Sequence, residues 1–153
     1  MQMQQKMRVE KQVMSKARWL YVILGLVIMM ALGTVYSWSV FRLPVEVLYD
    51  VGTAQSGLPY MTALLFYSLF MFLTGRFFKD WSPRKTILTG TLLVSVGWIL
   101  SAFAPNIQTL TIAYGVISGA GVGIAYGAPL TVVTRWFPEK KGLVIGMVLL
   151  GFG

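Results

Sequence analysis

Long stretches without charged residues alternate with short charged segments along this chain. The longest covers residues 86–134, 49 residues with no charged side chain, and Trp19–Phe41 and Val51–Gly75 precede it. A membrane-spanning helix needs about 20 apolar residues. As one helix, the longest stretch would extend about 74 Å, against a hydrocarbon core of roughly 30 Å. It must therefore turn back, and Pro105-Asn106 is the turn-forming pair near its middle. The pattern predicts four membrane crossings.

The helices predicted from these stretches define the fold class, an all-α membrane protein. They cover about residues 19–41, 58–78, 87–104 and 110–133, and a fifth begins at 142 and reaches 153. The fifth segment is too short to cross a bilayer. We therefore interpret the chain as the front part of a longer protein, with residues 1–17 as a cytoplasmic tail and residues 18–153 as an incomplete transmembrane domain.

Composition supports the same class and excludes several functions. Hydrophobic residues make up 56% of the chain and charged residues only 12%, against roughly 25% charged in soluble domains. The absence of Cys and His rules out disulfides, thiol chemistry and the usual transition-metal ligands. No nucleophile–base pair or metal cluster is evident, so we expect no cofactor, no metal and no enzymatic activity.

The basic residues are distributed unevenly between the two sides that four crossings create. Twelve of the 13 Lys and Arg residues lie in the N-terminal tail, in residues 76–85 and in residues 135–141, and the opposite side receives only Arg42. Basic loops remain on the cytoplasmic side. This distribution predicts a cytoplasmic N-terminus. It also argues against nucleic-acid binding, which needs the positive charge gathered on one face.

The fourth predicted helix carries glycines at four-residue spacing: Gly115, Gly119, Gly123 and Gly127. In a membrane, such a stripe lets a neighbouring helix approach closely. The stripe is explained by tight helix packing, or alternatively by a surface along which helices move during a transport cycle. Pro129 follows it and removes one backbone hydrogen bond, which favours a bend.

Aromatic residues with polar groups occur at several depths in the predicted helices. Trp19, Tyr21, Trp38 and Trp136 lie near helix ends, where such residues normally act as interfacial anchors. Tyr126 lies deeper, so its hydroxyl needs a partner within the protein or a wet cavity. No charged residue lies at mid-depth, so this part of the protein offers no buried charge to an ionic substrate.

The segment after the second predicted helix carries a recognisable motif. It reads Gly75-Arg-Phe-Phe-Lys-Asp80-Trp-Ser-Pro-Arg84-Lys85 and resembles the loop signature of the major facilitator superfamily, G-x-x-x-D-R-x-G-R/P-R-R/K. Gly75, Arg84 and Lys85 match. The acidic and basic residues are inverted here as Lys79 then Asp80, so Asp80 can serve the family's charge-pairing role only if it is displaced by one residue.

A second segment narrows the resemblance. Residues 119–129 read GAGVGIAYGAP, and Arg135-Trp-Phe-Pro-Glu-Lys140-Lys-Gly follows. This is similar to the fourth helix and following loop of oxalate/formate antiporter-like members of the superfamily. Residues 36–41 and the start of the fifth helix are similar as well. The resemblance extends over about residues 18–153.

The resemblance implies a 12-helix transporter made of two six-helix halves, with a central site exposed alternately to each side. Within this chain it assigns substrate contacts to Tyr36 and Tyr126, and roles in the conformational cycle to the loop residues Gly75, Asp80, Arg84, Lys85, Arg135 and Lys140. The family's basic substrate-binding residues fall in the C-terminal half, which is not part of this sequence.

The predicted function is transport of a small organic anion, a mono- or dicarboxylate, in a multi-pass protein of the bacterial cytoplasmic membrane. Its partners are then the lipid bilayer, the anion and the missing C-terminal half. The alternatives are a truncated membrane protein without transport activity, a helical interaction partner, and a small self-assembling four-helix transporter. The unfinished fifth helix argues against the last of these.

Overall fold

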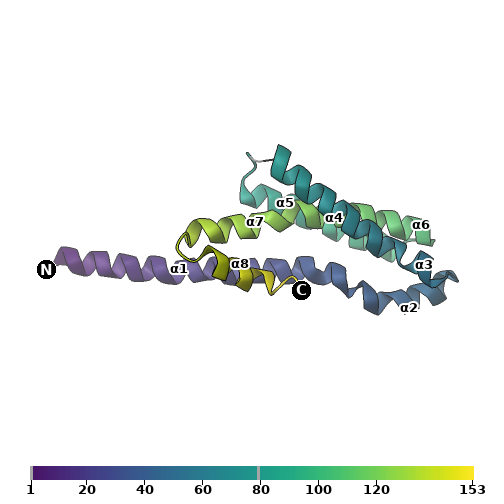
Figure 1. The fold of residues 1–153 in the computed structure, drawn as a ribbon, viewed down its shortest axis with the longest axis horizontal. Helices are drawn as coiled ribbons and strands as arrows, with labels where there is room; N and C mark the ends of the chain where they lie inside the picture. Colours follow the sequence, from purple (N-terminus) through teal and green to yellow (C-terminus); the bar gives the residue numbers. More distant parts are fainter. Residues whose placement is uncertain (1, 79) are drawn as a thin grey trace. The chain divides into compact units, whose positions relative to one another are not determined.

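The computed structural model describes the backbone of residues 2–78 and 80–153 and the side chains of residues 18–78 and 80–153. Lys79 and the side chains of the predicted tail lie outside the described residues. Within them the chain is helical, with no strand, so the predicted all-α fold is confirmed (Figure 1). The elements are α1 (Gln2–Gly33), the 3₁₀-helical η1 (Thr34–Ser37), α2 (Trp38–Tyr49), α3 (Thr53–Ser56), α4 (Leu58–Phe77), α5 (Pro83–Ala102), α6 (Ile107–Leu110), the π-helical η2 (Thr111–Ser118), α7 (Gly119–Trp136) and α8 (Lys141–Leu149).

Four of the helical segments are long and apolar enough to cross a membrane: Arg18–Tyr49, Thr53–Phe77, Pro83–Ala102 and Ile107–Trp136. Helices are suited to this environment because they satisfy their own backbone hydrogen bonds. The first segment continues to Tyr49, whereas the uncharged stretch ends at Phe41. Helix α2 contains Arg42, Pro44 and Glu46. Arg42 and Glu46 form an i,i+4 ion pair, which is compatible with continued helix.

Local sequence explains where several helices begin and end. Ser82 and Asn106 are N-caps, and their side chains accept hydrogen bonds from the backbone N–H groups of Lys85 and Thr109, which the first turn leaves unsatisfied. Helix α2 ends at Tyr49, and its C-cap is Asp50, the one described non-glycine residue with positive φ (49°). Asp tolerates this left-handed conformation better than most residues. Its backbone N–H donates to the Glu46 carbonyl.

The chain divides into two compact units, which are described separately. The larger unit is Leu32–Ala128, and the smaller unit contains the residues up to Ala31 together with Pro129–Gly153. The boundaries fall within α1 and α7. The larger unit contains η1, α2 to α6, η2 and the first part of α7, and therefore both tyrosines that the resemblance assigns to the substrate.

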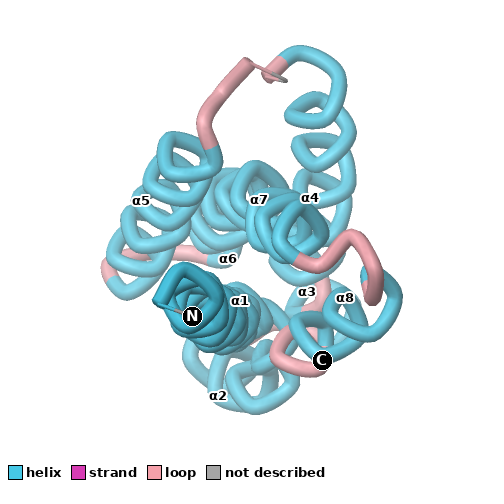
Figure 2. Tube along the Cα trace, turned by 90° about the vertical axis from the view of Figure 1, so that its left-hand side faces the viewer, coloured by secondary structure: helices cyan, strands magenta, loops and turns pink. Residues whose placement is uncertain are grey.

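The core of the larger unit is the middle of the fourth membrane segment, where every residue from Ser118 to Ala125 is buried. Within this unit the segment lies between α4 and α5, as the view along the helices shows (Figure 2). A Cβ placed on Gly119 would lie 2.6 Å from the Ala63 carbonyl oxygen of α4. A Cβ on Gly121 would lie 2.6 Å from the Gly90 carbonyl oxygen of α5. Only glycine allows both neighbours to come this close.

The predicted glycine stripe follows this contact for most of its length. Gly115 and Gly123 face α4, where added Cβ atoms would meet the Thr62 side chain and the Tyr67 backbone. Gly127 differs: it is exposed, and a Cβ there would have no heavy atom within 4 Å. The last glycine of the predicted stripe therefore lies outside the close contact. We call the contact of Gly115, Gly119 and Gly123 with α4, and of Gly121 with α5, the glycine seam.

The smaller unit also contains close backbone contacts. A Cβ on Gly25 would lie 3.2 Å from the Val148 side chain of α8 and 3.7 Å from Pro129. A Cβ on Gly151 would lie 2.5 Å from the Leu26 carbonyl oxygen. Pro129 is buried and lies inside α7, which stays helical on both sides of it. Small residues thus bring α1 close to the C-terminal part of the chain within this unit.

Candidate functional site

Four tyrosines of the larger unit form a group around α4, and we call them the tyrosine cluster. The rings of Tyr36 and Tyr60 have centroids 6.4 Å apart, and those of Tyr67 and Tyr126 are 5.4 Å apart. A hydrogen bond links the side chains of Tyr67 and Tyr126. The structure therefore pairs each of the two sequence-predicted residues, Tyr36 and Tyr126, with a tyrosine of α4.

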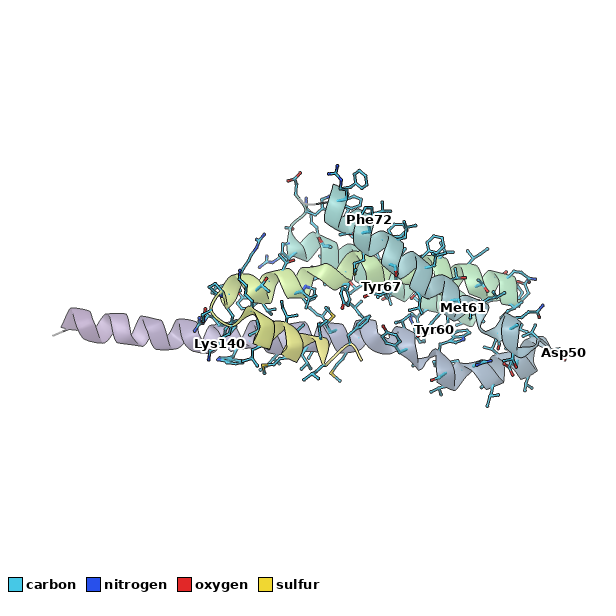
Figure 3. The ribbon with its side chains drawn as sticks, viewed as in Figure 1. Asp50, Tyr60, Met61, Tyr67, Phe72 and Lys140 are labelled. Carbon is cyan, nitrogen blue, oxygen red and sulfur yellow. The ribbon has the colours of Figure 1, made fainter. Side chains whose placement is uncertain are left out.

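Helix periodicity explains how α4 contributes to this group. Tyr60 and Tyr67 are seven residues apart, two turns of an α-helix, so they project from the same face, and Figure 3 shows both along α4. The glycine seam then holds this face near the fourth membrane segment. The Tyr67 backbone is the part of α4 nearest to Gly123, and the Tyr67 ring packs edge-on against Tyr126. Close backbone approach thereby places the two rings in contact.

A cavity of about 310 Å³ opens beside the Tyr36 end of the cluster. We call it the Arg42 cavity, because Arg42 is the one charged residue among the described residues that line it. Aromatic, hydroxyl and apolar side chains complete the wall, including Trp38, Thr53, Tyr60 and Met61. Its volume is at the lower end of the range, roughly 300–1,000 Å³, of small-molecule sites.

A polar network holds Arg42 in position. Its Nε lies 3.3 Å from Glu46 Oε1 and donates to Ser56 Oγ at 3.3 Å, while Nη2 donates to the Thr53 carbonyl at 3.3 Å. Ser56, fully buried, donates from its hydroxyl to Glu46 Oε1 at 2.6 Å. The Glu46 carboxylate therefore binds Ser56 more closely than it binds Arg42. The network ties α2 to α3 and orients the guanidinium.

Trp38 has a different environment from the one predicted for it. The interpretation as an interfacial anchor is wrong, because Trp38 is only 5% exposed. Its indole N–H donates to the Ser56 carbonyl at 2.9 Å, and its ring packs on Tyr114 with centroids 4.6 Å apart. An anchor needs access to the lipid headgroups. Trp38 instead packs within the larger unit and forms part of the wall of the Arg42 cavity.

Tyr114 connects the two irregular helical segments of the larger unit. It lies in η2, is 2% exposed, and donates from its hydroxyl to the Val35 carbonyl of η1 at 3.0 Å. A change from α to 3₁₀ helix alters which backbone groups are paired, and a buried carbonyl without a partner is costly. The Tyr114 hydroxyl provides a hydrogen-bond partner for the buried Val35 carbonyl.

The family-type loop residues lie away from the tyrosine cluster in sequence and belong to helix ends. Gly75 is in the last turns of α4, and Arg84 and Lys85 are in the first turn of α5. Among the described residues Asp80 forms no ion pair. The structure therefore shows where these residues lie, and their part in a conformational cycle stays a prediction.

In the smaller unit, Arg135 and Lys140 are exposed at the end of α7 and just before α8. The ion pair in this segment instead uses Glu139, whose Oε1 accepts from Arg18 Nη1 at 2.8 Å. A hydrogen bond from its own backbone N–H, with Arg18 adding to it, lowers the pKa of the Glu139 carboxyl. Trp19 packs edge-on against Phe137, and Tyr21 stacks on Trp136.

Sequence reasoning did not identify three residues of the tyrosine cluster and the Arg42 cavity, namely Arg42, Tyr60 and Tyr67. The sequence contains features that could have identified all three residues. Arg42 is the one basic residue on its side of the predicted membrane and stands four residues before Glu46, and Tyr60 and Tyr67 have helical i,i+7 spacing. No group of three or more possible metal ligands occurs among the described residues.

Comparisons with known proteins agree with this architecture. The Major Facilitator Superfamily pattern matches residues 23–153. The oxalate:formate antiporter of Oxalobacter formigenes is 31% identical over 137 residues, which are 89% of this chain and 32% of that protein. Monocarboxylate transporter 14 of Mus musculus is 39% identical over 79 residues, 52% of this chain and 15% of that protein. Apicoplast pyruvate carrier 1 of Toxoplasma gondii is 40% identical over 76 residues, 49% of this chain and 14% of that protein.

This chain spans about a third of the length of the antiporter, since the match covers 32% of it. The family match, by contrast, extends over most of the chain and includes the tyrosine cluster, the glycine seam and the Arg42 cavity. The chain therefore belongs to the Major Facilitator Superfamily, whose members are membrane transporters and not enzymes.

Proposed function

We propose that this chain forms the N-terminal part of a transporter for a small organic anion, a mono- or dicarboxylate, and that Tyr36 and Tyr126 contact the substrate. The observation that carries the proposal is the tyrosine cluster beside a cavity whose one charged lining residue, among those described, is the cation Arg42. The names of the relatives support the substrate class, because oxalate, formate, pyruvate and other monocarboxylates are small carboxylates.

The chemistry of the cluster suits such a substrate. Tyrosine hydroxyls donate hydrogen bonds to carboxylate oxygens, and the rings provide apolar surface. Neutral donors do not offset the full cost of burying a carboxylate charge. We therefore assign the main charge partner to the C-terminal half of the transporter, so that the substrate is bound between two halves and is released to either side as they move.

The same proposal gives the remaining predicted residues their roles. The basic segments at Arg84, Lys85, Arg135 and Lys140 face the cytoplasm of a bacterial cell with the N-terminus, and they change partners as the two halves move. Gly75 and Asp80 act at the same membrane face. The glycine seam serves as the packed surface that keeps α4, α5 and the fourth membrane segment together while this occurs.

The test is transport by the full-length transporter that contains this chain, reconstituted in proteoliposomes, with labelled oxalate, formate and pyruvate as probes. Tyr126→Ala and Tyr36→Ala are expected to reduce uptake about five- to thirty-fold, equivalent to roughly 1–2 kcal/mol for one neutral polar contact. Tyr126→Phe separates the hydroxyl from the ring. If only the ring matters, Tyr126→Phe retains activity.

Tyr21→Phe is the matched control, because Tyr21 packs on Trp136 in the smaller unit. It is expected to transport like the parent. Transport by Tyr126→Ala at the parent rate and equal membrane abundance would show that Tyr126 is structural. Failure of the parent to exchange any of the three carboxylates would refute the proposed function.

A further inference from the structure

We infer that the Arg42 cavity is an entry site for a small monocarboxylate on one face of the membrane, and that Glu46 limits its affinity. The inference rests on the proposed function and adds to it a charged anion contact, Arg42, in a cavity that Tyr36 also lines and Tyr126 does not. It depends on which charges the cavity exposes, on the geometry of the guanidinium, and on the position of Arg42 along the chain.

The cavity exposes one charge of the Arg42–Glu46 pair and not the other. Arg42 lines the cavity, whereas Glu46 is not among the described lining residues. The Arg42 side chain is 41% exposed and that of Glu46 only 20%. Glu46 is further engaged by the buried Ser56 hydroxyl at 2.6 Å. An anion entering the cavity therefore meets a cation before it meets the carboxylate behind it, and this polarity favours anions.

The guanidinium retains capacity to bind a carboxylate. Its described contacts use Nε and Nη2, each at the long distance of 3.3 Å, and Nη1 has no hydrogen-bond partner among the described residues. A guanidinium binds a carboxylate best through two parallel N–H groups. Nη1 and Nη2 can provide two such N–H groups if the long hydrogen bond from Nη2 to the Thr53 carbonyl is broken.

The rest of the wall selects for one carboxylate and a short apolar group. Ala54, Met61 and Trp38 provide apolar surface, and Tyr60 adds a ring with a hydroxyl. With a single cation, the cavity can neutralise one carboxylate and not two. A second carboxylate would remain unpaired, which is costly in a partly enclosed site. Pyruvate therefore fits this cavity better than oxalate does.

The position of Arg42 makes the site accessible from one face. Arg42 lies in the last part of the first membrane segment, Arg18–Tyr49, seven residues before its end. The three basic segments that the sequence places on the cytoplasmic side lie at the other helix ends. An anion reaching the protein from the face that carries Arg42 would be attracted there first, and one from the opposite face would not.

The test measures pyruvate exchange by the full-length transporter in proteoliposomes, from each face separately. Arg42→Gln is expected to raise KM at the Arg42 face about five- to tenfold, in line with a charge-assisted contact weakened by exposure, and to leave KM at the other face unchanged. Arg42→Lys keeps the positive charge but lacks the paired N–H groups of the guanidinium. Its KM at the Arg42 face is therefore expected to lie between the KM of the parent and that of Arg42→Gln. Glu46→Gln is expected to lower the same KM about twofold, because the competing carboxylate is neutralised.

The opposite signs of these two effects separate binding from structure. If the pair only ties α2 to α3, both variants would reduce membrane abundance or raise KM at both faces, and the inference is then wrong. Asp50→Asn is the matched control: Asp50 is an acid at the same end of α2 and does not line the cavity. Should Arg42→Gln fail to reach the membrane, Arg42→Lys and Glu46→Gln decide the question.

The outcomes also separate this inference from the proposed function. Exchange of pyruvate with an unchanged KM in Arg42→Gln overturns the entry site and leaves the transporter assignment intact. Absence of exchange in the parent with pyruvate, formate and oxalate refutes both. A comparison of oxalate with pyruvate completes the test, because an equal effect of Arg42→Gln on the two substrates would contradict the single-carboxylate preference.

Discussion

The glycine seam and the Arg42 cavity both involve helix α4, but α4 is closely packed at the seam and lines an open space at the cavity. In the seam, α4 approaches Gly119 and Gly123 of the fourth membrane segment with its backbone and approaches Gly115 with the Thr62 side chain. At the cavity, α4 contributes the side chains of Tyr60 and Met61 to the wall. Helix α4 is thus packed closely against glycines of the fourth membrane segment along the seam, and lines an open space with Tyr60 and Met61 at the cavity.

The seam and the tyrosine cluster also depend on each other. Tyr67 provides the backbone that approaches Gly123 and the ring that contacts Tyr126. A substitution that separates the helices at Gly123 must therefore also displace a ring of the cluster. The comparison teaches that the seam glycines also position the tyrosine cluster, although none of the four is among the described residues that line the Arg42 cavity.

The largest effect is expected at the cavity wall. Trp38→Ala removes a side chain that is 5% exposed and donates to the Ser56 carbonyl, so we expect a loss of about 3–5 kcal/mol of stability. Trp38→Phe retains the ring and isolates the indole N–H. Thermal unfolding in detergent measures both. Trp81→Ala is the control, because Trp81 is 39% exposed; equal losses at the two positions would mean that Trp38 acts as an anchor after all.

The next effect tests the seam. Gly119→Leu places a side chain where a Cβ alone would already lie 2.6 Å from the Ala63 carbonyl oxygen, and we expect a loss of about 1–3 kcal/mol. Gly127→Leu is the matched control, because a Cβ there meets no heavy atom within 4 Å. Membrane abundance and thermal stability provide the measurement. If both variants behave alike, the close approach of α4 is not what the glycines provide.

A smaller effect is expected where the two irregular segments meet. Tyr114→Phe removes the hydroxyl that donates to the Val35 carbonyl and retains the ring against Trp38 and Trp98. The expected loss is about 1 kcal/mol, for one buried hydrogen bond. Tyr49→Phe is a useful comparison, because its hydroxyl donates to the Ala104 carbonyl in a partly buried position. A greater loss for Tyr49→Phe would contradict the importance assigned to burial.

The smallest effect is expected outside both regions, at the Arg18–Glu139 pair. Because the pKa of Glu139 is lowered in the folded protein, its stabilising contribution is complete above the ordinary carboxyl pKa and is lost as the pH falls through the lowered value. Glu139→Gln should therefore lower stability slightly at neutral pH, and the difference from the parent should disappear as the pH falls below the lowered pKa of Glu139. Unfolding measured from pH 7 to pH 3 tests this. A larger loss at neutral pH than in Gly119→Leu would contradict the ranking.

Sequence by itself determined the features that depend on depth in the membrane. The four spans, the all-α fold and the family follow from where uncharged stretches begin and end, from Pro105-Asn106, and from the motifs around Gly75 and Arg135. The depth of a residue in the membrane can be predicted from the sequence, because charged side chains are costly in hydrocarbon and the rise per residue of a helix is constant.

Tertiary structure decided which side of each helix faces a neighbour. It placed Trp38 inside the larger unit, left Gly127 outside the glycine seam, and brought Arg42 and Tyr60 to one cavity. In a membrane segment these faces are poorly marked, because lipid-facing and core-facing residues are both apolar and no polar stripe separates them. A residue's depth follows from its position in the chain, whereas its partners follow only from how the helices pack.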